Sequence, residues 1–243
     1  MNTALVTGAS GGLGSAIVRV LAAKGYKIIA MDRVNKNELE KKFIDIKNSI
    51  ELFLGEVNFA NPQEVQKTIF TLFPHKKLSV LVNNAGISVG GNLINSSIED
   101  WNLMMNVNLT VPFILSQAFT KNAQEFQIKS SIINISSMVG IIGAKKPGYA
   151  ASKAGILGLT KSIAMQTGPN IRCNAIYPGA METPMTADWN KETREKIIKN
   201  TPVGHIAQPE EIAQIVSFLA DDKQSGYLTG SIINATGGQY LGQ

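Results

Sequence analysis

Short apolar runs alternate along the chain with longer segments in which apolar residues recur at helical spacing. Apolar runs bounded by turn residues are typical of strands buried on both faces of a parallel sheet. Such runs occupy residues 3–6, 27–31, 50–54, 78–83, 131–135, 171–177 and 231–234, and helical patterns occupy 15–22, 62–73, 101–127, 149–166 and 209–220. The alternation predicts an α/β fold with a doubly wound parallel sheet of about seven strands. No linker-like segment divides residues 1–243, so one domain is expected.

The first predicted strand runs into a glycine-rich turn and then into a helix. Residues 7–14 read TGASGGLG, and the helical pattern follows at once. Gly8, Gly12 and Gly14 let the backbone turn sharply and approach a pyrophosphate closely, while the following helix offers unpaired N–H groups to an anion. The segment predicts a dinucleotide-binding loop, and an ordinary tight loop is the alternative.

Asp32 follows the second predicted strand, about twenty residues beyond the glycine turn, where a carboxylate can bind the ribose hydroxyls of adenosine. A carboxylate there repels the extra phosphate of NADP, and Gly11 stands where a cation would favour that phosphate. Arg33 would pair with the phosphate if Asp32 turned away. We therefore expect NAD to be preferred over NADP, and a turn or helix cap is the alternative role for Asp32.

Tyr149 and Lys153 lie in the run YAASK and share one face of a predicted helix. Tyrosine has a pKa of about 10, and an adjacent positive charge lowers that pKa by favouring the phenolate. The pair is therefore a candidate for passing a proton to or from a substrate oxygen. A chance pairing on an amphipathic helix is the alternative.

With these motifs the chain resembles the short-chain dehydrogenase/reductase family over nearly its whole length. The family's glycine motif matches residues 7–14, its N-N-A-G element residues 83–86, and its P-G-x-x-x-T segment residues 178–183. The resemblance implies a Rossmann-type fold and NAD(P)-dependent interconversion of a secondary alcohol and a ketone. The cofactor-binding positions are then Gly8, Ser10, Gly12, Leu13, Gly14, Asp32, Arg33, Asn58, Phe59, Asn84, Ala85, Gly86, Tyr149, Lys153, Pro178, Gly179, Met181 and Thr183.

The family's active-site tyrosine and lysine correspond to Tyr149 and Lys153. In reduction the tyrosine would protonate the carbonyl oxygen, and the lysine would keep the phenol acidic and hold the ribose. The active-site serine, which would hydrogen-bond the same oxygen, lies at residue 136 or 137, and we favour Ser137 because it leads into residues 138–140.

The family's active-site asparagine corresponds to Asn106 or Asn108. We favour Asn108 because it stands seven residues after Trp101. The resemblance implies that Asn108 interrupts a helix and helps to hold a water through which Lys153 exchanges protons, and a plain helix kink is the alternative. Asn58 is a departure, since the family commonly has a carboxylate there for the adenine amino group. An asparagine keeps an acceptor oxygen, so adenine binding should survive.

Residues 184–201 occupy the place of the family's variable substrate lid. Trp189 within this segment would line an apolar pocket or fix the lid to the core. Lys145 and Lys146 form a basic pair close to Tyr149, and they would favour an anionic substrate or simply lie on a solvated loop.

The overall pattern, including the run TPVGHIAQPEEIA, resembles the 3-oxoacyl-(acyl-carrier-protein) reductase branch of the family. Reduction of 3-oxoacyl thioesters is therefore the leading specific function. A sugar, polyol or diol dehydrogenase is the enzymatic alternative, and a dinucleotide-binding redox sensor or scaffold is the non-enzymatic one. A pure binding protein would not need the serine, tyrosine and lysine together.

Composition bears on nucleic-acid binding, metal binding and cellular location. The net charge of +5 comes from scattered lysines without a nucleic-acid motif, so solvated surface charge is expected. Cys173 is expected to be a buried structural thiol, and His75 and His205 lack metal-ligand spacing. With a strand beginning at residue 3 and no membrane-length apolar run, we expect a cytoplasmic protein that binds neither metal nor membrane. The resemblance implies a homotetramer or homodimer formed through helices 101–127 and 149–166.

Overall fold

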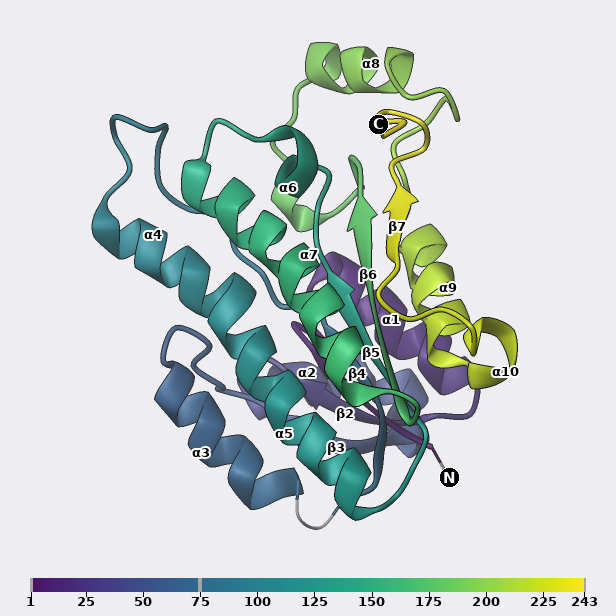
Figure 1. Cartoon of the computed structure of the whole chain (residues 1–243). Helices are drawn as coiled ribbons and strands as arrows, with labels where there is room; N and C mark the ends of the chain where they lie inside the picture. The colour runs from purple at the N-terminus through teal and green to yellow at the C-terminus, as the bar shows by residue number, and fades with distance from the viewer. Residues whose placement is uncertain (1, 74–75, 243) are drawn as a thin grey trace.

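The computed structural model describes residues 2–73 and 76–242. In this part of the chain a seven-stranded parallel sheet has the order β3-β2-β1-β4-β5-β6-β7 (Figure 1). The strands are β1 (Thr3–Thr7), β2 (Lys27–Met31), β3 (Ile50–Leu54), β4 (Leu78–Asn83), β5 (Ser130–Ile135), β6 (Ile171–Pro178) and β7 (Ile232–Ala235). Each predicted strand coincides closely with an observed one, so the doubly wound sheet is confirmed.

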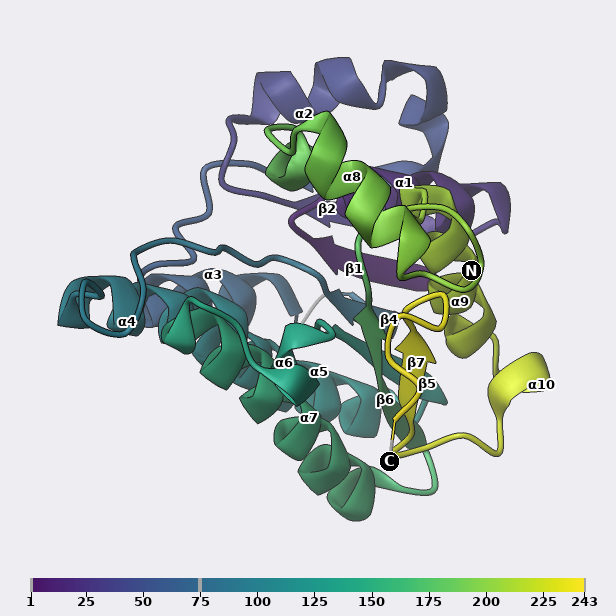
Figure 2. The same ribbon diagram turned by 90° about the horizontal axis from the view of Figure 1, so that it is seen from above.

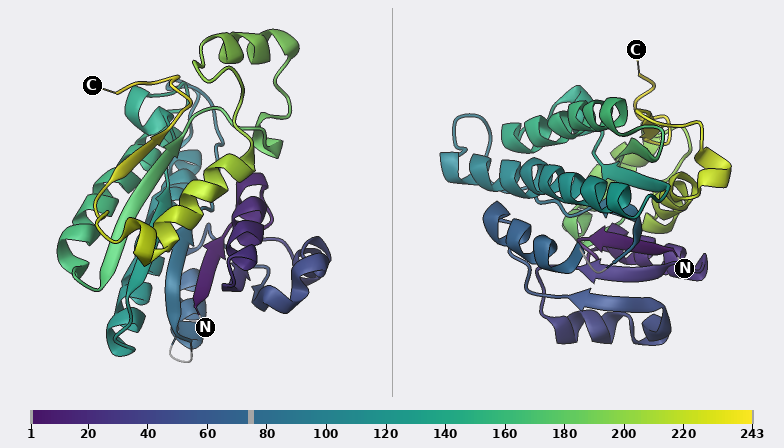
Figure 3. Two further views of the ribbon diagram at one scale, coloured as in Figure 1. Left: turned by 90° about the vertical axis from the view of Figure 1, so that its right-hand side faces the viewer. Right: turned by 60° about the horizontal axis from the view of Figure 1, so that its bottom comes forward.

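Helices cover both faces of the sheet, as Figure 2 and Figure 3 show. One face carries α1 (Gly12–Ala23), α2 (Lys36–Lys42) and α9 (Pro209–Ala220), and the other carries α3 (Pro62–Leu72), α4 (Ile98–Met105), α5 (Val111–Glu125) and α7 (Pro147–Thr167). Short elements are η1 (Ile44–Ser49), α6 (Val139–Ile142), η4 (Pro184–Thr186), α8 (Lys191–Lys199) and α10 (Asp222–Ser225).

Side-chain alternation along the strands builds two separate cores. In β1, Val6 packs in the cluster that contains Ile17 of α1, while its neighbour Leu5 packs in the cluster that contains Phe119 of α5. All four side chains are fully buried. Successive residues of a strand point to opposite faces, so a strand between two helical layers must be apolar throughout. Because both faces of each strand are buried, the strands appear in the sequence as continuous apolar runs.

The strand order reverses direction between β1 and β4: β2 and β3 follow on one side of β1, and β5, β6 and β7 follow on the other side of β4. At such a switch point a crevice opens beyond the carboxyl ends of the strands, which is where ligands bind in folds of this kind. The loops that leave β1, β2, β4, β5 and β6 all reach this end of the sheet. Residues 184–201, including α8, lie above them at the top of Figure 1.

The predicted helix at residues 101–127 is not continuous. A π-helical turn, η3 (Asn106–Thr110), separates α4 from α5. Pro112 has no N–H to donate to the Asn108 carbonyl four residues earlier, so a regular α-helical hydrogen bond is impossible there. An interruption at Asn108 is what the family resemblance implied, and the π-helical turn contains that residue.

Small residues on α7 serve contacts within the chain. A Cβ on Gly155 would lie 2.7 Å from Cδ2 of Leu109 in the π-helical turn, and a Cβ on Gly148 would lie 2.5 Å from Cε of Met104 in α4. Gly158, by contrast, has no atom within 4 Å of an added Cβ in the described structure. Close packing of α7 on η3 and α4 thus accounts for part of its glycine content.

Candidate active site

A cavity of about 910 Å³ opens beyond the carboxyl ends of the strands. Each of the eighteen residues expected to bind the cofactor lines it, and so does Ser137. Asn108 is the one predicted site residue outside the lining. The fold therefore gathers at one place the residues that the sequence distributes over almost the whole chain.

Two glycines make the turn after β1 possible. Gly8 has a φ of +63°, and a Cβ on it would lie 2.9 Å from Cα of Ala85. A Cβ on Gly14 would lie only 1.9 Å from the Gly8 carbonyl oxygen, so no other residue fits there without moving the backbone. The Asn84 side chain holds the turn from the neighbouring loop, donating to the carbonyls of Thr7 at 2.9 Å and Gly8 at 3.2 Å.

This turn presents the start of α1 to the cavity. The N-cap residue Gly11 makes no side-chain capping hydrogen bond, so the first N–H groups of the helix are not satisfied by a cap. Gly12 and Leu13 at the helix start both line the cavity. Free N–H groups and a positive helix end form an anion site, which fits the pyrophosphate of a dinucleotide.

Asp32 lines the cavity just after β2, and its side chain is fixed by backbone N–H groups. Its Oδ2 accepts from the N–H of Ser10 at 2.7 Å, and its Oδ1 accepts from the N–H groups of Arg33 at 2.7 Å and Val34 at 3.3 Å. The side chain thus caps a turn, as the alternative interpretation held, and it also faces the cavity. Three hydrogen bonds oppose the rotation that would let Arg33 take over a phosphate site.

Lys153 lies beneath the Tyr149 ring. Its Nζ is 6.0 Å from the ring centroid and donates to the Ile135 carbonyl at 2.8 Å. Burial lowers the pKa of Lys153 to about 8, since the charged form loses hydration. In this structure the cation is satisfied by the backbone at the end of β5.

Tyr149 has its pKa raised, not lowered. Burial is the largest cause, and hydrogen bonding with the Ser137 side chain acts in the opposite direction with a smaller effect. The net shift is therefore upward, opposite to the lowering that the spacing from Lys153 led us to expect. The phenol is protonated at neutral pH and can donate a proton.

The two serines after β5 have different surroundings. Ser136 is buried and its hydroxyl donates to the Lys153 carbonyl at 2.7 Å, which fixes α7 to the sheet. Ser137 is more open, and its Oγ accepts a long hydrogen bond of 3.4 Å from the N–H of Val139. The Ser137 hydroxyl also contacts the Tyr149 phenol, so both groups could hydrogen-bond a single substrate oxygen. This geometry favours Ser137 as the active-site serine.

Asn108 stands behind the cavity wall. Its Oδ1 accepts from the Ile87 N–H at 2.9 Å, and its Nδ2 donates to the Ile87 carbonyl at 2.9 Å and to Ser152 Oγ at 3.0 Å. A Cβ on Gly86 would lie 3.2 Å from Nζ of Lys153 and 3.5 Å from Oδ1 of Asn108, so a glycine at this position leaves room for both side chains. Asn106 instead donates to the Ala60 carbonyl near the surface.

The segment 184–201 contributes an apolar wall to the cavity. Met185, Trp189 and Ile197 line it. Arg194, which the sequence interpretation missed, holds this segment from within α8. Its guanidinium pairs with Glu182 and donates to the carbonyls of Trp189 at 3.2 Å and Thr186 at 3.3 Å. Across the cavity, a Cβ on Gly12 would lie 3.0 Å from Cγ2 of Thr183, so the segment begins directly over the glycine turn.

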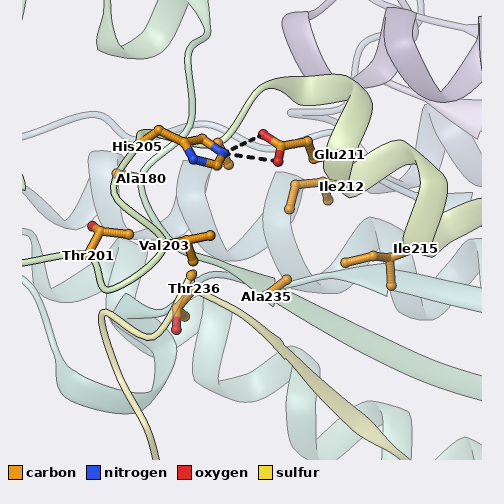
Figure 4. Close-up of a pocket in the computed structure, with 11 residues that line it drawn as sticks. Ala180, Thr201, Val203, His205, Glu211, Ile212, Ile215, Ala235 and Thr236 are labelled. Carbon is orange, nitrogen blue, oxygen red and sulfur yellow. Dashed lines mark hydrogen bonds and ion pairs between the residues drawn. The ribbon is translucent and has the colours of Figure 1, made fainter. Parts of the chain in front are cut away.

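Other candidate residues lie elsewhere. Lys146 donates to the Ser88 carbonyl at 3.1 Å, and neither it nor Lys145 lines the cavity. His205 lies at a separate pocket of about 160 Å³, where it pairs with Glu211 at the start of α9 (Figure 4). His75 is outside the described residues. Cys173 is buried, and burial raises the pKa of its thiol to about 12.

Two further properties concern the described residues as a whole. Residues 2–73 and 76–242 contain no group of three or more His, Cys, Asp or Glu side chains able to hold a metal ion. Among their helices, none combines the length and the hydropathy that a membrane crossing requires.

Comparison with known proteins gives a consistent result. A family model described as enoyl-(acyl carrier protein) reductase matches residues 8–239. The 3-oxoacyl-(acyl-carrier-protein) reductase of Thermotoga maritima is 37% identical over 241 residues, covering 96% of each chain. Human (3R)-3-hydroxyacyl-CoA dehydrogenase is 36% identical over 253 residues, covering 98% of this chain and 95% of the human one. Among solved structures, 4-hydroxyisoleucine dehydrogenase with NADH superposes with a TM-score of 0.90 at 30% identity, covering 100% of both chains.

Proposed function

The chain belongs to the short-chain dehydrogenase/reductase family, and from that premise we propose that it reduces 3-oxoacyl thioesters with a preference for NADH over NADPH. As a member of the family it is an NAD(P)-dependent oxidoreductase that interconverts hydroxyl and keto groups. The single observation that carries the proposed oxidoreductase chemistry is the meeting of Ser137, Tyr149 and Lys153 with the glycine turn in one cavity.

The cavity fits a nicotinamide dinucleotide along its length. The start of α1 would hold the pyrophosphate, Asp32 the adenosine ribose, and residues 178–183 the nicotinamide carboxamide. When bound, the nicotinamide supplies or accepts a hydride. The chain must align the reacting carbon of the substrate and transfer a proton to or from the oxygen bonded to it.

Ser137 and Tyr149 would act on that oxygen together. In the reducing direction the Tyr149 phenol donates its proton, and its raised pKa keeps the proton available at neutral pH. The Ser137 hydroxyl hydrogen-bonds the same oxygen and stabilises its developing negative charge. Lys153 is charged below its pKa of about 8, and its charge favours the phenolate that proton donation leaves behind.

Asp32 supports the choice of NADH. Its carboxylate faces the cavity and is fixed by N–H groups of Ser10, Arg33 and Val34. A 2'-phosphate placed beside it would meet an uncompensated negative charge. Ribose hydroxyls, in contrast, would donate hydrogen bonds to the same oxygens.

The substrate class rests on the relatives and on the lid. Two of the relatives at 36–37% identity are named for 3-oxoacyl or 3-hydroxyacyl chemistry. Met185, Trp189 and Ile197 offer an apolar wall against which an acyl chain would pack. We assign residues 184–201 as the substrate lid. We also expect the protein to be cytoplasmic and to form a homodimer or homotetramer, as the family resemblance implied, and a monomer by light scattering would contradict that assembly.

Oxidation of a small sugar, polyol or diol is the second candidate. It is favoured by the likeness to a solved glucose/ribitol dehydrogenase of Brucella melitensis, which superposes with a TM-score of 0.88 at 26% identity. A dinucleotide sensor without turnover is disfavoured, since a cavity for binding alone has no use for a paired serine and tyrosine.

A substrate panel separates the candidates. Acetoacetyl-CoA is assayed for reduction with NADH and with NADPH, and polyols and hydroxy acids are assayed for oxidation with NAD. The proposal predicts the highest kcat/KM with acetoacetyl-CoA and NADH. A higher kcat/KM with a polyol, or with NADPH as the better cofactor, would contradict the corresponding part of the proposal.

A further inference from the structure

Gln239 places an unpaired carboxamide in the active-site cavity. It follows β7 in the C-terminal segment and lines the same cavity as Ser137 and Tyr149. Its Oε1 is buried and has no hydrogen-bond partner within residues 2–73 and 76–242. Buried polar groups are nearly always paired, because leaving one unpaired costs free energy comparable to a lost hydrogen bond. An unpaired group in a ligand cavity points to a partner on the ligand.

The backbone holds this side chain in place. Gly237 and Gly238 have φ angles of +63° and +85°, and Cβ atoms on them would lie 2.8 Å from Thr201 Cγ2 and 2.7 Å from Pro202 Cγ. The segment therefore packs tightly on the end of the lid. The Gln239 N–H also donates to the Thr236 carbonyl at 3.1 Å. The carboxamide is thus presented by a rigid turn.

Contacts place the carboxamide close to the reacting groups. A Cβ on Gly179 would lie 3.1 Å from Oε1 of Gln239. The preceding residue, Pro178, accepts a hydrogen bond at 2.9 Å from the N–H of Met138, which directly follows Ser137. Gln239 therefore contacts Gly179, next to the residue that binds the loop carrying Ser137.

We propose that Gln239 is a specificity-determining residue that hydrogen-bonds a second polar group of the substrate, beside the carbonyl that is reduced. The inference rests on the proposed function, which makes that second group the thioester carbonyl of a 3-oxoacyl thioester. A primary carboxamide offers N–H donors and a carbonyl acceptor on the same end, and a half-turn about its last bond exchanges them. The unpaired Oε1 and the thioester carbonyl are both acceptors, so binding requires that half-turn, which places the N–H group at the position of Oε1 to donate to the thioester carbonyl.

The test compares two substrates that differ only in this group. One is the N-acetylcysteamine thioester of acetoacetate, and the other is the thioether in which CH₂ replaces the thioester carbonyl. Both keep the reducible ketone. Wild type is compared with Gln239→Met, which keeps the length of the side chain without its polar end, and with Gln239→Glu, which keeps acceptors but removes the N–H donors. NADH affinity is measured for each variant by fluorescence.

We expect Gln239→Met and Gln239→Glu each to lower kcat/KM for the thioester by about tenfold, the scale of one lost hydrogen bond. The thioether rate should stay within about twofold, and NADH affinity should not change. Equal losses on both substrates, no loss on either, or a matching loss of NADH affinity would overturn the role of Gln239 while leaving the proposed function intact. A wild-type enzyme that reduces neither compound would refute both.

Discussion

Lys153 donates a hydrogen bond of 2.8 Å from its Nζ to the backbone carbonyl of Ile135. Ile135 is the last residue of β5, two residues before Ser137, so the contact joins the catalytic helix to the loop that carries the serine. Lys153 is almost completely buried there. In the proposed mechanism, the charge of this one side chain acts on the Tyr149 phenol and on the bound ribose.

The reduction rate should depend on pH through Lys153. Its pKa is lowered to about 8, so the ammonium is present below that pH and is lost as pH rises through it. Tyr149 keeps its proton over this range because burial raises its pKa above the usual value. We expect kcat/KM for acetoacetyl-CoA reduction to fall above about pH 8, as the pH profile of the free enzyme would report. A profile flat to about pH 10 would show that the charge of Lys153 is not required.

Gly14 should be irreplaceable in the glycine turn. Gly14→Ala puts a Cβ within 1.9 Å of the Gly8 carbonyl oxygen, so the turn must open and the anion site is lost. NADH affinity, measured by fluorescence titration, should fall by more than about tenfold. Gly158→Ala is the matched control because its Cβ meets open space on α7. That variant should bind NADH normally and be slightly more stable, since alanine favours helix.

Asp32 should control the choice between the two dinucleotides. Asp32→Asn keeps an oxygen for the Ser10 N–H but removes the negative charge that opposes a 2'-phosphate. The ratio of kcat/KM with NADPH to that with NADH should rise about tenfold or more. Asp45→Asn removes a charge from the exposed pair with Arg19 and should leave the ratio unchanged. An unchanged ratio in Asp32→Asn would mean that other residues select the cofactor.

Arg194 should determine how firmly the lid holds the substrate. Arg194→Met removes its ion pair with Glu182 and its hydrogen bonds to the carbonyls of Trp189 and Thr186. The pair is about one-third exposed and is screened by solvent, so we expect KM for the thioester to rise only about fivefold, with a smaller change in kcat. Lys191→Met on the exposed side of α8 is the control and should leave KM unchanged. Identical KM values in the two variants would show that Arg194 does not hold the lid over the substrate.

The fold was predictable because a strand that is buried on both faces consists of apolar residues. Ala4, Leu5 and Val6 are apolar on both sides of the strand, and a strand of that kind can only lie between two layers. The helix α2 was not predicted, since Lys36–Lys42 contains Leu39 as its one buried residue and lacks an apolar stripe. Its position depends on the cap at Asn35, which accepts from the Glu38 N–H at 2.9 Å.

The site was predictable as a set of residues but not in its electrostatics. Tyr149 and Lys153 could be paired from their spacing, yet the direction of the phenol pKa depends on burial by segments far away in sequence. Gln239 and Arg194 carry no local pattern that distinguishes them from surface residues. Their roles follow from contacts with Gly179 and Glu182, which only the folded chain brings near.

In the proposed reaction Tyr149 provides the proton while NADH reduces the keto group of a 3-oxoacyl thioester. Its most direct test is nicotinamide absorbance during reaction of acetoacetyl-CoA with NADH, in wild type and in Tyr149→Phe. We expect turnover by wild type, a loss of at least about a hundredfold in kcat for the variant, and unchanged NADH affinity in both. Turnover that survives in Tyr149→Phe at the wild-type rate would contradict the account.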